Sequence, residues 1–201
     1  MKVSTIFYTI LALFSIACTL LAGGPPTPPK SSGSNQAMIA RGKYLTTICA
    51  CNDCHTPKIF TKMGMELDTT RMLSGHMEND TLPAIPSGVI APGGWGALTN
   101  GHLTGWAGPW GKSFARNLTP DTTTGLGSWT EAIFIKAIRT GKDMGEGRPI
   151  LPPMPWEMYR TMTDDDLTAI FAYLKSLPPI ANATPDPIAP SGERMPTMHM
   201  K

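Results

Sequence analysis

Charged residues are scarce in this sequence. Asp, Glu, Lys and Arg together make up 16% of the 201 residues, and the formal net charge at pH 7 is +2. A net charge this small does not indicate binding to nucleic acid or to an acidic partner. Hydrophobic residues make up 41% of the chain, which is enough for one buried core. The 20 glycines and 20 prolines indicate long loops in place of dense regular structure.

Cysteines are also few, and three of the 4 lie within one short stretch. The segment Cys51-Asn52-Asp53-Cys54-His55 has the pattern C-x-x-C-H, which attaches a c-type haem. Two cysteines three positions apart can each add a sulfur to one haem vinyl group. The histidine that follows is placed under the iron as the proximal ligand. We therefore predict one covalent haem c held by Cys51, Cys54 and His55.

A zinc site is the main alternative for this stretch, because Cys49 and the three residues of the motif supply four soft ligands. Structural zinc sites usually draw their ligands from two separated clusters, and these four are too close together to organise a fold. A thioredoxin-like redox pair would need a βαβ pattern around it, and the sequence shows none. We therefore favour the haem and interpret Cys49 as a small buried hydrophobe.

The N-terminus predicts export. Residues 3–22 follow Lys2 without a single charge, as in a signal peptide, and covalent haem attachment in bacteria occurs outside the cytoplasm. The segment fits three fates: a cleaved signal, lipidation at Cys18, or retention as a membrane anchor of about 20 residues. We predict an exported, periplasmic protein. Membrane attachment through the N-terminus and simple secretion are ranked about equally. Residues 23–35, rich in Pro, Gly and Ser, are predicted as a linker.

Helical patterns occur on both sides of the motif. Residues 35–48 predict a helix with Asn35 as its N-cap. The capping box at residues 128–131 predicts the start of a second helix, which Gly141 ends. Thr163 caps the clearest helix, whose first turn carries three aspartates that complement the helix dipole. The apolar stripe of that helix is Leu167, Ile170, Phe171 and Leu174.

Residues 56–114 show no helical period, and turn residues dominate them. We predict a long loop with a short hairpin that folds over the haem. His76 and His102 lie in this stretch, and either side chain could act as a distal ligand or an acid–base group. Ordinary loop histidines are the more economical interpretation of both.

A rigid, extended segment covers residues 149–156, where prolines flank Met154. Prolines fix φ and remove amide donors, so this segment can hold a thioether in place at little entropic cost. Residues 180–201 form a Pro-rich tail that we predict to be disordered. The methionines and the histidine near its end are soft ligands that suit Cu(I), and copper handling there would be compatible with a haem function.

The order of these pieces resembles class I cytochrome c over residues 36–179. More narrowly, RGKYL…CNDCHTP, NLTPD…G-x-G-x-W, RTG and LPPMPW…MTDDDLTAIFAYLKSLPP are similar to bacterial cytochromes. Those cytochromes occur as single-haem proteins or as haem domains of membrane-bound dehydrogenases. The resemblance implies an all-α cytochrome c fold of about three to five helices around one covalent haem, with a long loop insertion.

The resemblance also implies roles for single residues. Met154 becomes the distal ligand, and it is preferred over Met144, Met158 and Met162 because it alone sits between prolines in a loop. The helix around the Gly42 position is expected to cross the terminal helix near residues 171–174.

The proximal histidine, His55, is expected to donate its second ring N–H to a backbone carbonyl within residues 117–120. With histidine and methionine both bound, the iron has no open position for a substrate.

The predicted function is therefore one-electron transfer and not catalysis. The expected redox partners are a dehydrogenase, an oxidase or another cytochrome. A five-coordinate haem that binds a small gas or acts on peroxide is the alternative, and it requires that Met154 does not ligate.

Overall fold

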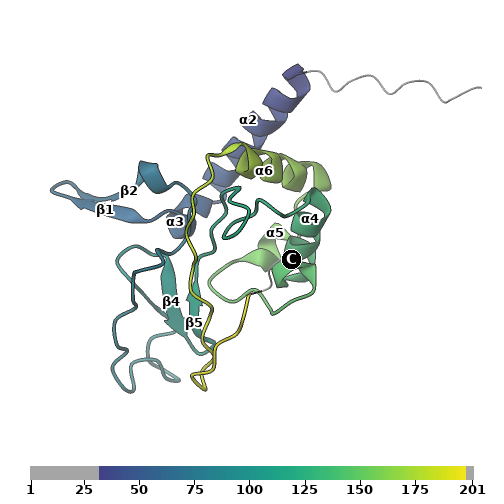
Figure 1. Ribbon diagram of the computed structural model, residues 1–201. Coiled ribbons are helices and arrows are strands. Elements are labelled where there is room, and N and C mark those ends of the chain that lie inside the picture. Colours follow the sequence, from purple (N-terminus) through teal and green to yellow (C-terminus); the bar gives the residue numbers. More distant parts are fainter. Residues whose placement is uncertain (1–31, 198–201) are drawn as a thin grey trace, which may run out of the picture. The chain divides into compact units, whose positions relative to one another are not determined.

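This computed structural model describes residues 32–197, which contain five α-helices and two short 3₁₀ turns (Figure 1). The helices are α2 (Ser32–Ile48), α3 (Cys51–His55), α4 (Glu131–Thr140), α5 (Trp156–Tyr159) and α6 (Asp164–Ser176), and the 3₁₀ turns are η1 (Thr69–Arg71) and η2 (Asp143–Gly145). All but the first residues of α2 belong to one compact unit, Asn35–Lys201. The predicted export segment and residues 23–31 of the predicted linker lie outside the described residues. The prediction for the last four linker residues is corrected, since they form the start of α2, and Asn35 therefore lies inside the helix and is not its N-cap.

Within residues 32–197, no helix has both the length and the apolar character needed to cross a bilayer.

Side-chain caps fix where the two long C-terminal helices begin. The Thr163 hydroxyl accepts a hydrogen bond from the amide of Asp166 at 3.2 Å, as predicted. Helix α4 begins later than predicted, because its N-cap is Thr130, whose hydroxyl accepts from the amide of Ile133, and not Ser128. Gly141 ends α4 in the left-handed conformation at φ 65°, as the sequence predicted.

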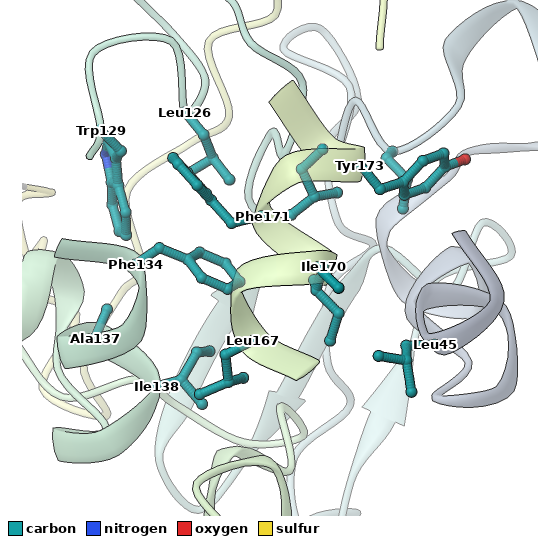
Figure 2. Close-up of a cluster of buried hydrophobic side chains, with 13 residues drawn as sticks. Leu45, Leu126, Trp129, Phe134, Ala137, Ile138, Leu167, Ile170, Phe171 and Tyr173 are labelled. Atoms are coloured by element: carbon teal, nitrogen blue, oxygen red, sulfur yellow. The ribbon is translucent and has the colours of Figure 1, made fainter. Parts of the chain in front are cut away.

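The core lies where α4 and α6 pack together (Figure 2). The rings of Phe134 and Phe171 stack with their centroids 5.2 Å apart, and Leu167 is only 1% exposed. Each such buried side chain contributes roughly 1.5–3 kcal/mol of hydrophobic stabilisation. The predicted apolar stripe of α6 is therefore the centre of the core, and Leu45 brings α2 into the same cluster.

Helix α2 crosses α6 at Gly42. A Cβ atom on Gly42 would lie 1.9 Å from the carbonyl oxygen of Ala169 and 2.8 Å from the Cβ of Tyr173. Only a residue without a side chain allows two backbones to come this close. The expected crossing is confirmed, and it begins slightly earlier on α6 than the predicted residues 171–174.

The all-α prediction is corrected by five short strands within the predicted loop. Strands β1 (Lys58–Thr61) and β2 (Gly64–Leu67) form the expected hairpin, and β3 (Leu98–Thr99), β4 (Gly105–Gly108) and β5 (Gly111–Phe114) form an antiparallel sheet. The strands are at most four residues long. So short a strand leaves no alternating pattern in the sequence, and backbone pairing across the turns decides the structure instead.

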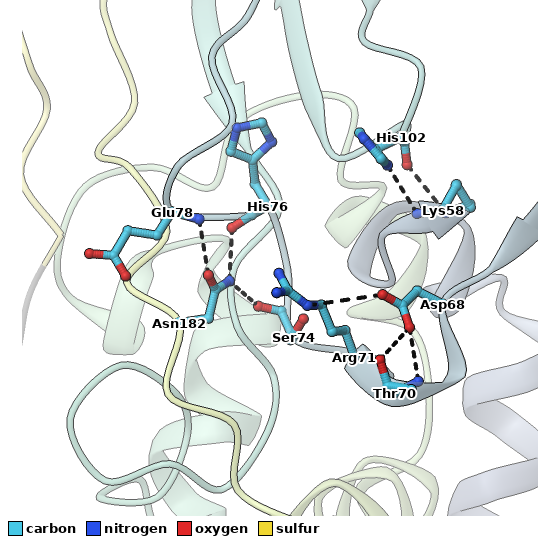
Figure 3. A network of polar contacts seen from close by, with 9 residues as sticks. All are labelled: Lys58, Asp68, Thr70, Arg71, Ser74, His76, Glu78, His102 and Asn182. Carbon is cyan, nitrogen blue, oxygen red and sulfur yellow. Dashed lines mark hydrogen bonds and ion pairs between the residues drawn. The ribbon is translucent and has the colours of Figure 1, made fainter. Parts of the chain in front are cut away.

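The C-terminal segment, residues 180–197, also differs from the prediction, which made it disordered. In Figure 1 it runs as a yellow strap beside β5, and the amide of Ile188 donates to the carbonyl of Lys112 at 2.9 Å. The Asn182 amide group donates to the carbonyls of Ser74 (2.7 Å) and His76 (2.8 Å) (Figure 3). These hydrogen bonds satisfy backbone carbonyls of the loop. They therefore fix the position of the polar, Pro-rich C-terminal segment, although that segment has no hydrophobic core of its own.

Candidate functional site

One apolar cavity is lined by all four residues that the sequence analysis proposed to bind a haem. Cys51, Cys54, His55 and Met154 line it together, although about a hundred residues of chain separate the last from the others. Its walls come from all five helices, from β4 and β5, from residues 150–155 and from the C-terminal strap. The four residues named from motif and spacing are thus brought to the same site by the fold.

The two cysteines lie on the short helix α3, which follows Ala50 in the left-handed conformation at φ 56°. Both are free thiols, and both line the cavity. Burial raises the pKa of the Cys51 thiol to about 12 and raises that of Cys54 as well. Within the folded chain the two sulfurs are therefore neutral thiols that face an apolar space from one helical turn.

His55 is buried, and its Nδ1 atom lies 2.7 Å from the carbonyl oxygen of Arg116. Because a carbonyl only accepts, Nδ1 carries the proton and donates, which leaves Nε2 with a lone pair. Burial lowers the pKa of His55 and thereby favours the neutral ring, the form that binds metals. The expected backbone acceptor exists, one residue before the predicted range of 117–120.

Hydrogen bonds fix the backbone on both sides of the Met154 side chain. The Met154 carbonyl accepts from the amide of Trp156 at 2.9 Å, and the Ser113 hydroxyl of β5 donates to the carbonyl of Pro152 at 2.6 Å. Among its rivals, Met158 is 70% exposed, and Met162 also lines the cavity. The structure thus leaves Met162 as the competitor to Met154 that needs an experimental control.

Two arginines at the cavity are functional candidates that sequence reasoning missed. The Nε atoms of Arg116 and Arg148 are buried without a hydrogen-bond partner among the described residues. Arg116 also pairs with Asp143 through Nη1 at 2.5 Å and lies over the Trp129 ring at 5.0 Å. Burial lowers the pKa of both guanidinium groups, and the Asp143 carboxylate counteracts this effect.

Unsatisfied buried donors cost free energy, so they favour an anionic or acceptor-rich group beside them. The predicted haem carries two propionate carboxylates, which match such donors. The residues present therefore fit a c-type haem: two thiols, a neutral histidine, a thioether, apolar walls and two cations with buried Nε donors. No local pattern marks either arginine, since only the folded chain brings them to the cavity.

The two histidines of the loop do not line this cavity. The ring nitrogens of His76 bond the Thr104 hydroxyl (2.9 Å) and the carbonyl of Asp80 (3.0 Å), and His102 Nδ1 accepts from the amide of Lys58 at 3.1 Å. Across residues 32–197, no three His, Cys, Asp or Glu side chains are placed to hold a metal ion. Both histidines therefore lie outside the cavity, and each is hydrogen-bonded within the loop.

No protein-family model matches the chain. Among characterised proteins, it is 27% identical to a nicotinate dehydrogenase subunit of Pseudomonas putida, over 89% of this chain and 13% of that protein. It is 28% identical to the fructose dehydrogenase cytochrome subunit of Gluconobacter japonicus, over 77% of this chain and 25% of that one. It is 36% identical to the cytochrome c subunit of a quinone-type alcohol dehydrogenase of Gluconobacter oxydans, over 81% of this chain and 27% of that one.

The chain thus spans between 13% and 27% of the length of these relatives. Their names support a place in a cytochrome c family, a c-type haem and a helical haem-binding fold in coarse outline. Apart from the nicotinate dehydrogenase subunit, the relatives named here are cytochrome subunits of dehydrogenases. The prediction that this chain transfers electrons is consistent with these names and is developed below as a proposal. Class I membership and a single haem stay predictions.

Proposed function

We propose that the chain is a one-electron carrier with a single haem c, attached through the sulfurs of Cys51 and Cys54. His55 is the proximal ligand and Met154 the distal ligand. The observation that carries the proposal is the convergence of these four side chains on one apolar cavity. The cytochrome domain extends over residues 36–179, and the strap of residues 180–197 supports it.

When bound, the haem supplies a one-electron Fe(III)/Fe(II) couple. His55 offers Nε2 because the carbonyl of Arg116 fixes the proton on Nδ1. Met154 would supply a thioether as the second ligand, which would leave no open position for a substrate; a thioether ligand favours Fe(II) and raises the reduction potential. Arg116 and Arg148 would bind the propionates through their unpaired Nε donors. The apolar walls exclude water, which limits reorganisation during electron transfer.

The proposed donor is a dehydrogenase with which the chain acts as a cytochrome subunit, and the proposed acceptor is an oxidase or another cytochrome. The formal net charge of +2 offers little long-range steering, so association depends on short-range contacts near the haem. We place the protein outside the cytoplasm, in the periplasm, either free or attached to the membrane through its N-terminus.

The absorption spectrum of the ferric protein tests this assignment. Wild type is expected to show the weak far-red band of a sulfur–Fe(III) bond, and Met154→Ala is expected to lose it. Met162→Ala is the matched control, because Met162 lines the same cavity and its loss must leave the band in place. Met158→Ala, at an exposed position, serves as a second control.

Other outcomes would contradict separate parts of the proposal. A band that persists in Met154→Ala and vanishes in Met162→Ala would make Met162 the distal ligand. If wild type lacks the band and binds carbon monoxide when reduced, the iron is open, and a gas-binding or peroxide function replaces electron transfer. Haem that acidified solvent extracts from the denatured protein would disprove the covalent attachment to Cys51 and Cys54.

A further inference from the structure

Lys58, directly after the C-x-x-C-H turn, is an unusual lysine because it is only 7% exposed. Its ammonium group lies within hydrogen-bonding distance of four backbone carbonyls. The closest are those of Thr56 at 2.5 Å and Asp53 at 2.8 Å, followed by His102 at 3.3 Å and Asn52 at 3.5 Å. Lysines are almost never fully buried unless a partner satisfies the charge. Here the partners are neutral carbonyls, so the hydrogen bonds are satisfied while the positive charge persists.

None of the ion pairs within residues 32–197 includes Lys58. The nearest opposing charge is Asp53, which is exposed and raises the pKa of Lys58 against the larger, lowering effect of burial. The carbonyls of Asn52, Asp53 and Thr56 that hold the ammonium group belong to the turn that carries the proposed haem-binding residues Cys54 and His55. A buried cation therefore acts electrostatically on the proximal side of the cavity.

The position of this cation is fixed from two directions. Its hydrogen bonds hold it at the end of α3, and the backbone amide of Lys58 donates to Nδ1 of His102 in the loop that precedes β4 (Figure 3). The His102 ring in turn meets Phe60 of the hairpin edge-on, with centroids 5.4 Å apart. The ammonium group thus has little freedom to move towards solvent when the charge at the haem site changes.

Resting on the proposed function, we propose that Lys58 is a buried cation that raises the reduction potential of the haem iron. Reduction adds one electron to Fe(III) and gives Fe(II), so the site loses one positive charge. A fixed positive charge nearby favours the less positive state, and the effect is strong where the surroundings have a low dielectric constant. Because the charge is buried, dissolved salt screens it only weakly.

Redox titration of the holoprotein, followed by its absorption spectrum, tests the proposal. Three variants separate charge from hydrogen bonding: Lys58→Met removes both, Lys58→Gln keeps a donor without the charge, and Lys58→Arg keeps the charge. We expect Lys58→Met and Lys58→Gln to lower the equilibrium constant for reduction by roughly threefold to tenfold, where tenfold corresponds to about 59 mV. Lys58→Arg should stay near wild type.

Lys62→Met is the matched control, since Lys62 lies on the same hairpin but is exposed. Lys62→Met should change the reduction potential little, and any change should vanish at high salt. The shift caused by Lys58→Met should persist at high salt. A wild-type potential in both Lys58→Met and Lys58→Gln would overturn the proposal.

A loss in Lys58→Met that Lys58→Gln restores would also overturn it, because the hydrogen bonds and not the charge would then matter. A protein without a covalent haem spectrum would refute the proposed function instead, so the two failures are distinguishable.

Discussion

Replacing Gly42 by alanine tests the helix crossing that closes the core. The new Cβ would lie 1.9 Å from the Ala169 carbonyl oxygen, whereas ordinary contacts of this kind are 3.4–4 Å. The obstacle is backbone and cannot rotate away, so α2 and α6 must separate by more than an ångström. Separation would loosen the packing of Leu45 against α6, at the edge of the cavity that Thr46 and the cysteines line.

The expected cost follows from two opposing effects. Overpacking of a core contact costs roughly 1–3 kcal/mol, and a displaced backbone places this site at the upper end. Alanine returns about 1 kcal/mol through its higher helix propensity. We expect a net loss of about 1–2 kcal/mol in the free energy of unfolding, which lowers Tm by roughly 2–8 °C in a domain of this size.

Urea unfolding of the holoprotein, followed by tryptophan fluorescence and by the haem absorption, measures this loss. Gly96→Ala is the control, because nothing lies within 4 Å of a Cβ at that position and its φ is not positive. The control should be neutral or slightly stabilising. If Gly42→Ala unfolds at the same urea concentration as wild type, with an unchanged m value, the close crossing does not exist and the reasoning is refuted.

Two further predictions concern the loop and its strap. Asn182→Ala removes the hydrogen bonds that this side chain donates to the carbonyls of Ser74 and His76 and accepts from the amide of Glu78. Because these backbone groups lose their partners, the free energy of unfolding should fall by roughly 2–4 kcal/mol. A loss below about 0.5 kcal/mol in urea unfolding would contradict this account. Burial lowers the pKa of His76 below its ordinary value of 6.5. As the pH falls, His76 is therefore protonated in the unfolded chain before it is protonated in the folded chain. The free energy of unfolding should consequently fall as the pH drops below about 6.5. The slope contributed by one such group is at most about 1.36 kcal/mol per pH unit, and His76→Gln, measured by urea unfolding at pH 7.5 and 5.5, should be flatter over this range than wild type. An equal slope in the variant would show that His76 does not titrate differently on folding.

Sequence reasoning identified those parts of the site whose chemistry depends on residues that are neighbours in the chain. The C-x-x-C-H spacing requires one helical turn, and the prolines around Met154 fix their own backbone, so both could be named without a fold. The caps at Thr163 and Gly141 are similarly local. The capping box was placed two residues early because Ser128 and Thr130 both carry hydroxyls, and only the path of the chain into α4 decides between them.

The parts that were missed depend on contacts between distant segments. The strands within the loop are too short to show a period, and they form because Gly111 at φ +95° turns β4 back onto β5. Arg116 and Arg148 carry no local signal of a role at the cavity. The C-terminal strap was predicted to be disordered from its composition, but Asn182 fixes it to loop backbone more than a hundred residues earlier.

The strap also has a consequence for the order in which the molecule is built. Pro187 contributes to the wall of the cavity, and Asn182 supplies bonds that the loop around Ser74 lacks until that residue is present. During synthesis the C-x-x-C-H turn therefore emerges well over a hundred residues before the segment that completes its pocket. The thiols of Cys51 and Cys54 stay accessible during that interval, and the pocket is completed only after residues 180–197 have been made.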